Sequence, residues 1–205
     1  MHLEALSDNN KKIFAKLGIF KDFYLAGGTA LALQIGHRIS IDFDLFSTKE
    51  ISTDLLSEVK NIFPEEKVII SVSDQGELTC FVNDIKITFL HYPFPTILPT
   101  VSYERISLLG VPEIAATKAY TIGRRGSYKD YIDLYFIISE KHSSLEEIIT
   151  LAEKKYGDEF NGRLFLEQLL YLEDIADTEI IFLKNKVDKE QLKAFFTQLM
   201  KNIKI

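Results

Sequence analysis

Apolar and polar positions follow two different periods in the first 105 residues of the chain. Ser7, a residue type favoured at helix N-caps, precedes an apolar stripe at helical spacing. Residues 40–46 instead alternate apolar and acidic side chains with period two, which is typical of a half-buried strand. The predicted elements are, in order, a helix to about residue 17, a strand over 23–26, a helix over 29–35 that Gly36 ends, a strand over 40–46 and a helix from about 53 to 64.

Three further apolar runs predict the rest of a sheet. They cover residues 67–72, 78–82 and 85–90, and Asn83-Asp84 between the last two is a two-residue hairpin signal. Residues 93–99 hold three of the five prolines and predict an extended connector.

The pattern changes to a helical period in the second half of the chain. Pro112 stands at a typical first helical position. The predicted helices run from there to about 123 and then near 129–140, 145–156, 162–172 and 189–202. We therefore expect an α+β fold with two parts. The first is an α/β core over residues 1–105, with a mixed sheet and flanking helices. The second is a helical region over residues 106–205 that contributes to the cleft of the functional site.

Composition narrows the class of protein. Of 205 residues, 46% are hydrophobic and 26% are charged, which is enough for a packed core. The net charge of −6 argues against a protein that coats nucleic acid by bulk electrostatics, although a local basic groove remains compatible with it. The single cysteine, Cys80, fits a reducing compartment, and neither a secretory signal nor a membrane span is visible. We expect a soluble, cytoplasmic protein with no membrane partner.

The densest group of candidate site residues lies between residues 25 and 47. Asp42 and Asp44 are two apart in a predicted strand, so that both project from one face while Ile41 and its odd-numbered neighbours face the core. Two adjacent carboxylates repel each other unless a cation lies between them, and Mg²⁺ prefers such oxygen ligands. Gly27-Gly28, before a predicted helix N-terminus at Thr29, allows close approach of a phosphate. The pattern predicts a site for Mg²⁺ and a nucleoside triphosphate.

Each of these signals has an ordinary structural interpretation. A double glycine also marks a turn, and two acids on a strand can simply be solvated. Their combination is more specific, because the thirteen residues between Gly28 and Asp42 fit one short helix leading into the next strand.

A second candidate group lies in the helical region. Lys118 and Arg125 are seven residues apart, which is two helical turns, and Asp130 and Asp133 share one face of the next helix. The two cations are suited to phosphate groups, and the two acids could orient those cations or act as a base. Solvated charges on a pair of surface helices are the alternative.

These residues resemble those of a known family. Gly27-Gly28 followed by Asp42-Phe43-Asp44 is similar to the signature of the DNA polymerase β-like nucleotidyltransferase superfamily. The segments GGTALAL, GHR and DFDLF resemble those of one branch, the AbiEii/AbiGii-type abortive-infection nucleotidyltransferase toxins. The downstream motifs of that branch resemble Lys118, Arg125-Gly126, Lys129-Asp130 and Asp133-Leu134. The resemblance covers residues 20–140.

The resemblance implies a nucleotidyltransferase fold and a Mg²⁺-dependent transfer of a nucleotide from a triphosphate to an RNA acceptor such as the 3′ end of tRNA. It also implies a toxin with a separate antitoxin protein as partner. The implied catalytic residues are Asp42, Asp44, Lys118, Asp130 and Asp133, of which Asp42 and Asp44 bind the metal. The implied nucleotide-binding residues are Gly27, Gly28, Thr29, Lys118, Arg125 and Lys129.

One departure from the superfamily pattern bears on catalysis. The superfamily usually supplies a third carboxylate from a later strand, and here Ile87-Thr88-Phe89 is the best match, with Thr88 in place of the acid. Without this third carboxylate the site lacks one metal ligand and the usual base for the attacking hydroxyl, so activity is expected to be weak. Two alternatives therefore stay open: an enzyme that modifies a small molecule such as an antibiotic, and a degenerate module that binds a nucleotide or a partner without turnover.

Overall fold

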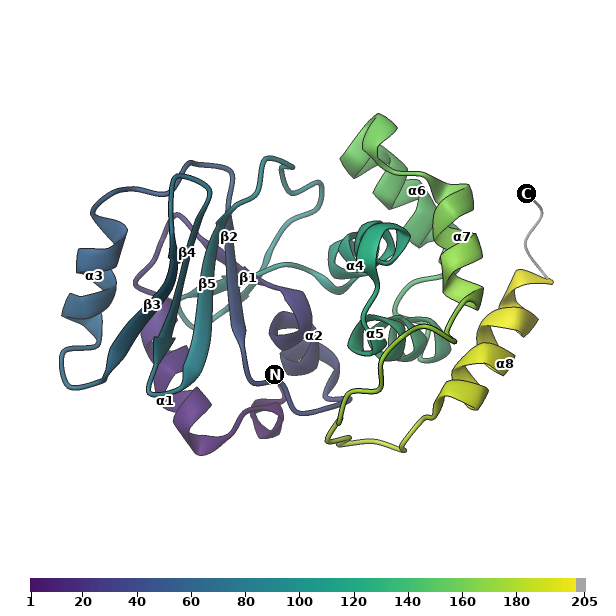
Figure 1. The fold of residues 1–205 in the computed structure, drawn as a ribbon, viewed down its shortest axis with the longest axis horizontal. Helices are drawn as coiled ribbons and strands as arrows, with labels where there is room; N and C mark the ends of the chain where they lie inside the picture. The colour runs from purple at the N-terminus through teal and green to yellow at the C-terminus, as the bar shows by residue number, and fades with distance from the viewer. Residues whose placement is uncertain (202–205) are drawn as a thin grey trace. The chain divides into compact units, whose positions relative to one another are not determined.

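The computed structural model describes residues 1–201, without the side chain of Arg125. The chain divides into two compact units, Met1–Gly110 and Val111–Ile205. The first unit contains the sheet, and the second is helical throughout its regular elements (Figure 1).

The first unit is built on a mixed sheet of seven strands. In the order β3-β4-β5-β2-β1-β7-β6, the β2–β5 and β1–β7 pairs are parallel and the other pairs are antiparallel. The strands are β1 (Tyr24–Ala26), β2 (Phe43–Ser47), β3 (Val68–Ser73), β4 (Glu77–Val82), β5 (Ile85–His91), β6 (Val101–Tyr103) and β7 (Ile106–Leu108). The strand that carries Asp44, β2, therefore lies beside β5.

Helices cover both faces of this sheet. A short 3₁₀ helix, Leu3–Ala5, precedes α1 (Asp8–Leu17), whose predicted cap is confirmed because the Ser7 hydroxyl accepts a hydrogen bond from the Asn10 N–H at 3.2 Å. Phe14 of α1 stacks on Phe43 of β2, with ring centroids 6.3 Å apart. Figure 1 shows α3 (Leu55–Ile62) on one side of the sheet and α2 (Gly27–Ile35) on the other.

The period-two pattern of β2 is confirmed, but its start was predicted too early. Phe43 and Leu45 are buried and Asp44 is half-buried, as expected. Ile41, expected to face the core, is 56% exposed, and the strand begins after Asp42. The reason is that side chains take the backbone carbonyls that a longer strand would need: the Asn10 amide donates to the Ile41 carbonyl and the Thr29 hydroxyl to the Asp42 carbonyl.

The hairpin between β4 and β5 is as predicted. Asn83 and Asp84 have φ values of +47° and +67°, the two positive values that a type I′ turn requires. Strands β6 and β7 were not predicted, because three residues each are too few to display a period. Tertiary pairing creates β7, since Leu108 pairs with Leu25 in the middle of the sheet.

The second unit consists of five helices among the described residues. They are α4 (Val111–Arg125), α5 (Tyr128–Ser139), α6 (Leu145–Tyr156), α7 (Gly162–Leu170) and α8 (Lys189–Met200), with a 3₁₀ turn at Gly157–Glu159. All five were predicted to within a few residues, and the predicted end of the last helix at 202 lies outside the described residues. Within residues 1–201, no helix is long and apolar enough to span a bilayer.

Candidate active site

Gly27 lies at the junction of β1 and α2, in direct contact with a predicted metal ligand. Its φ of +65° belongs to the left-handed region that favours glycine. A Cβ at this position would lie 2.5 Å from the Asp44 Oδ2 atom, so that the carboxylate packs against the glycine backbone. Asp44 comes there because its strand partner on β1 is Ala26, the residue before the glycine. The sheet register thus brings the glycine turn and the acid together.

Gly28 lies against a buried cation. A Cβ at Gly28 would collide with an Nη2 atom of Arg38, whose residue is 3% exposed. The guanidinium also donates to the Ile39 carbonyl at 3.1 Å. Arg38 therefore belongs to the candidate site, although its signal in the sequence is weak: a basic pair, His37-Arg38, directly before the acidic strand.

Thr29 holds the loop before β2 in place. Its side chain is buried, and its hydroxyl lies 2.8 Å from the Ser40 hydroxyl and bonds the Asp42 carbonyl. The side chain is therefore engaged by the loop, while the backbone N–H of Thr29 lies in the first turn of α2. The N-cap residue Ala26 provides no side-chain cap for this turn. The N–H groups in the first turn of a helix have no partner within the helix, and together with the positive dipole end they favour an anion.

The two acids fit a metal that shares its ligands with a substrate. Asp42 is exposed, Asp44 is half-buried, and both offer the hard oxygen donors that Mg²⁺ prefers. Among the described residues, no group of three or more His, Cys, Asp or Glu side chains could hold an ion. A site of two carboxylates suits Mg²⁺ with a triphosphate, because phosphate oxygens and water complete the six ligands.

The strand beside Asp44 carries a threonine at the matching position. Asp44 and Thr88 are Cα partners on the parallel strands β2 and β5, and Thr88 is 8% exposed. Asp84, the nearby acid in the sequence, lies in the exposed hairpin turn. Four residues along a strand span about 13 Å, so Asp84 is far from the partner of Asp44.

The second candidate group forms a compact ion cluster in the helical unit. The Lys118 Nζ atom on α4 lies 2.7 Å from Asp130 Oδ1 and 2.8 Å from Asp133 Oδ2 on α5. Asp133 is fully buried, and the other Asp130 oxygen accepts hydrogen bonds from the N–H and hydroxyl of Ser127 at 3.0 and 2.8 Å. Two carboxylates around one ammonium group fix its position.

The remaining predicted nucleotide-binding residues lie near this cluster in the sequence. Lys129 is half-buried. Helix α4 extends to Arg125, as the spacing argument required, but the Arg125 side chain lies outside the described part of the chain. An approach of the Lys118 cluster to Asp42 and Asp44 stays a prediction.

Burial also affects a tyrosine beside this cluster. The pKa of Tyr131 is raised to about 12, first because burial disfavours the phenolate and second because the Asp130 charge repels it. The hydroxyl donates to the Gln168 carbonyl at 2.9 Å. Tyr131 is therefore a neutral structural group and not a candidate acid or base near neutral pH.

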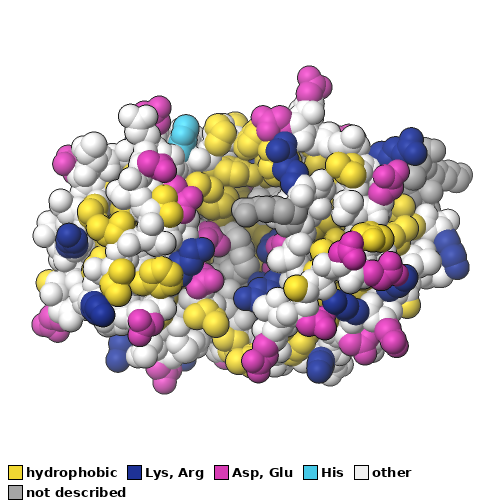
Figure 2. Space-filling model, in the orientation of Figure 1, with side chains coloured by type: hydrophobic (Ala, Val, Ile, Leu, Met, Phe, Trp, Pro, Cys, Tyr) yellow, Lys and Arg dark blue, Asp and Glu magenta, His cyan; other side chains and the backbone are white. Residues whose placement is uncertain are grey.

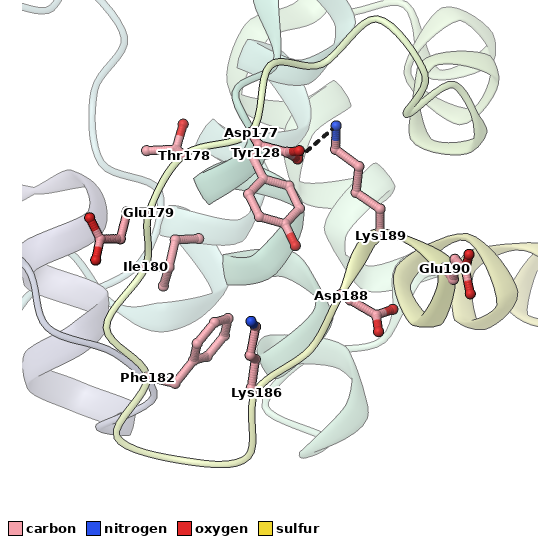
Figure 3. Close-up of a pocket in the computed structure, with 10 residues that line it drawn as sticks. All are labelled: Tyr128, Asp177, Thr178, Glu179, Ile180, Phe182, Lys186, Asp188, Lys189 and Glu190. Atoms are coloured by element: carbon pink, nitrogen blue, oxygen red, sulfur yellow. Dashed lines mark ion pairs between the residues drawn. The ribbon is translucent and has the colours of Figure 1, made fainter.

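A separate pocket of the helical unit contains none of the predicted site residues. It has a volume of about 690 Å³ and lies between Tyr128 and the segment 177–190. Figure 3 shows the Tyr128 ring at its centre, with the ion pair of Asp177 and Lys189 at 2.8 Å on one side. Two lysines and four acids line it, so its charge does not single out one class of ligand.

The fold defines the class of protein. A solved structure from H. pylori described as a candidate nucleotidyltransferase superposes with a TM-score of 0.58 at 19% identity, covering 94% of each chain. JHP933 from Helicobacter pylori gives a TM-score of 0.57 at 18% identity, covering 96% of this chain and 94% of that one. The first unit, with its helical companion, therefore has the nucleotidyltransferase fold.

Sequence comparison narrows the class to a family. The family model of the nucleotidyl transferase AbiEii toxin, type IV TA system, matches residues 12–204, and the chain belongs to this family. The protein aq_aa25 of Aquifex aeolicus (strain VF5) is 33% identical over 187 residues, covering 90% of this chain and 89% of that protein. Family and fold together support nucleotidyl transfer as the type of activity.

Proposed function

We propose that the protein transfers a nucleotide from a nucleoside triphosphate to a hydroxyl group of an RNA acceptor, with Mg²⁺ as cofactor. The observation that carries the proposal is the packing of the Asp44 carboxylate against Gly27 at the N-terminus of α2. The proposed metal ligand Asp44 is then in direct contact with the helix N-terminus that would bind phosphate. A metal–triphosphate complex needs this arrangement.

Each group in the first unit has a defined task in this proposal. Asp42 and Asp44 hold the ion, which neutralises phosphate charge and supplies Lewis-acid chemistry when bound. The N–H groups of Gly27, Gly28 and Thr29 bind phosphate oxygens, while the Thr29 hydroxyl keeps Asp42 in place through its carbonyl.

The cations of the second unit supply the remaining positive charge. A triphosphate with its metal keeps a negative charge that two acids cannot neutralise. In this proposal Lys118, whose amine is ion-paired with Asp130 and Asp133, neutralises charge on the transferring group, and Arg125 and Lys129 bind the nucleotide. Replacing Lys118 by alanine should lower the transfer rate far more than metal affinity, because its effect falls mainly on the transition state. A separation of roughly 15 Å or more between the Lys118 amine and both carboxylates, beyond the ~10 Å screening length, would refute this role.

The proposed acceptor is the 3′ end of tRNA, and the proposed biological role is that of a toxin held in check by a separate antitoxin protein. The description of the family as a toxin of a type IV TA system supports this role. On the face shown in Figure 2, acidic and basic side chains are interspersed, which suits local recognition of an RNA end better than binding along an RNA backbone.

The decisive experiment compares two labels on the same triphosphate. The protein is incubated with Mg²⁺, total tRNA and each of the four triphosphates labelled at the α-phosphate or at the γ-phosphate. We expect tRNA to acquire the α label and not the γ label, since nucleotidyl transfer retains the α-phosphate and releases pyrophosphate. Asp42→Asn should abolish the signal. Label transfer only to a small molecule, such as an added antibiotic, would replace the RNA acceptor by the small-molecule alternative.

Thr88 favours one other outcome, that of a module which binds without turnover. Calorimetry with Mg²⁺ and a triphosphate separates the two. Binding should weaken about tenfold, or ~1.4 kcal/mol, in Asp42→Asn and in Asp44→Asn. Binding of this kind without labelled product in any assay would leave a nucleotide-binding module. Unchanged affinity in both variants would contradict the site itself.

A further inference from the structure

A row of polar side chains crosses the sheet next to Asp44. Thr88 on β5 is the Cα partner of Asp44 on β2, and Thr79 on β4 is the Cα partner of Thr88. Partners in a sheet project from the same face on strands about 4.8 Å apart. Glu77, two residues before Thr79 on the same strand, projects from that face as well. Asp44, Thr88, Thr79 and the Glu77 carboxylate therefore follow one another on the same face of the sheet.

The distances within this row join it into a hydrogen-bonded chain. The Thr79 Oγ1 atom lies 2.5 Å from Glu77 Oε1 and 3.2 Å from Thr88 Oγ1. Thr79 and Thr88 are 3% and 8% exposed, whereas Glu77 is half-buried and reaches solvent. The two hydroxyls are thus shielded from water, and the acid at the end of the chain is not.

The chemistry of the three groups fixes the direction of the chain. A hydroxyl has one proton to donate, and an ionised carboxylate only accepts. Thr79 therefore donates to Glu77, and Thr88 donates to the Thr79 oxygen. The lone pairs of the Thr88 oxygen remain to accept a proton from a group on the Asp44 side.

We propose that Glu77 takes up the proton of the acceptor hydroxyl through Thr88 and Thr79, an inference that rests on the proposed nucleotidyl transfer. The acceptor oxygen forms a bond to the α-phosphorus, and pyrophosphate leaves with the electron pair of the bond that breaks. The acceptor proton moves to Thr88 Oγ1, the Thr88 proton to Thr79 Oγ1, and the Thr79 proton to the Glu77 carboxylate. Glu77 then loses the proton to solvent, and the chain returns to its starting state.

Other acids of the two candidate groups are already engaged. Asp42 and Asp44 hold the metal in the proposed function, and Asp130 and Asp133 are ion-paired to Lys118. Glu77 carries no such ion pair among the described residues and ends a hydrogen-bonded chain that starts beside Asp44. It acts through the two threonines and does not touch the acceptor.

The conservative variant Glu77→Gln tests this relay. Its amide oxygen still accepts from Thr79, so the chain keeps its geometry, but it cannot take up a proton at neutral pH. We expect kcat for transfer to fall about 10²-fold or more, with KM, the affinity for Mg²⁺ and triphosphate, and the melting temperature unchanged. Glu65→Gln, the same chemical change at an exposed position, is the matched control.

Two further variants distinguish a relay from a structural pair of threonines. Thr79→Val keeps the shape but removes the hydroxyl and should lower kcat as Glu77→Gln does, while Thr79→Ser should recover most of that loss. Thr88→Asp puts a carboxylate beside Asp44, so that Glu77→Gln should have no further effect on kcat in its background.

The outcomes separate the relay from the function on which it rests. If the wild type transfers nucleotide and Glu77→Gln transfers it equally well, the relay is wrong and the proposed function stands. The relay is also refuted if Glu77→Gln lowers kcat by the same factor in the wild type and in Thr88→Asp. In Thr88→Asp the new carboxylate takes up the proton, so Glu77 should no longer affect kcat. A wild type that transfers to no acceptor refutes both.

Discussion

Replacing Gly27 by alanine probes the tightest contact of the candidate site. The φ of +65° is available to glycine at no steric cost, and an added Cβ would lie 2.5 Å from Asp44 Oδ2. Alanine therefore introduces two strains at once: a left-handed backbone with a side chain, and a collision with the carboxylate that we assign to the metal.

The magnitude follows from these two terms and one that opposes them. A residue with a Cβ in the left-handed region costs about 1–2 kcal/mol. Relief of the collision requires Asp44 to move from its position against the glycine. Alanine also restricts the unfolded chain, which stabilises the fold by about 0.4–1 kcal/mol. The net loss of unfolding free energy should be ~1–2 kcal/mol, and the affinity for Mg²⁺ and triphosphate should fall by at least tenfold because Asp44 is displaced.

Thermal unfolding followed by circular dichroism and titration calorimetry measure the two effects. We expect a melting temperature lower by about 2–4 °C per kcal/mol for a chain of this size. Gly76→Ala is the control, since its φ is not in the left-handed region and its nearest contact would be Asp74 Oδ1 at 3.5 Å. If Gly27→Ala matched this control in both stability and affinity, Asp44 would not depend on the glycine, and the reasoning would fail.

Four buried side chains give three further predictions. Glu113 and Lys155 form an ion pair at 2.8 Å with almost no exposure, so Glu113→Gln should cost about 3–5 kcal/mol, and the double change Glu113→Leu with Lys155→Met should cost less in denaturant titrations. Burial raises the pKa of Tyr131 from 10.0 to about 12, so stability present below pH 10 should fall by on the order of 2–3 kcal/mol as pH rises to 12, and Tyr131→Phe should flatten that loss. Burial raises the pKa of Cys80 to about 11, so alkylation at pH 8 should be far slower than that of a free thiol until the protein unfolds.

Several elements were predictable from local sequence alone. The helix capped by Ser7, the Asn83-Asp84 turn and the helix over residues 145–156 are each determined by side chains within a few positions of one another. Family membership was also predictable, because Gly27-Gly28 and Asp42-Phe43-Asp44 keep a fixed spacing. Caps, turns and periodic patterns of this kind involve residues that are close in the sequence, so the sequence alone predicts them.

The start of β2 and the environment of its acids depended on residues distant in the sequence. Asn10 and Thr29 bond the carbonyls of Ile41 and Asp42, so that the strand begins only after Asp42, although the alternating pattern includes both residues. Arg38 becomes part of the site because its guanidinium fits the space that Gly28 leaves open.

Residue types alone show which positions are chemically suited to a metal, to a phosphate and to a cation cluster, since acids, glycines and lysines keep their chemistry in any fold. Which of these residues are neighbours depends on the folded arrangement of the chain. Strand register placed Asp44 beside Thr88 and Thr88 beside Thr79, and it thereby joined Glu77 to the site. No periodicity predicts such a register, because it is chosen by the packing of a whole sheet, in which a shift of one residue would turn every side chain to the opposite face.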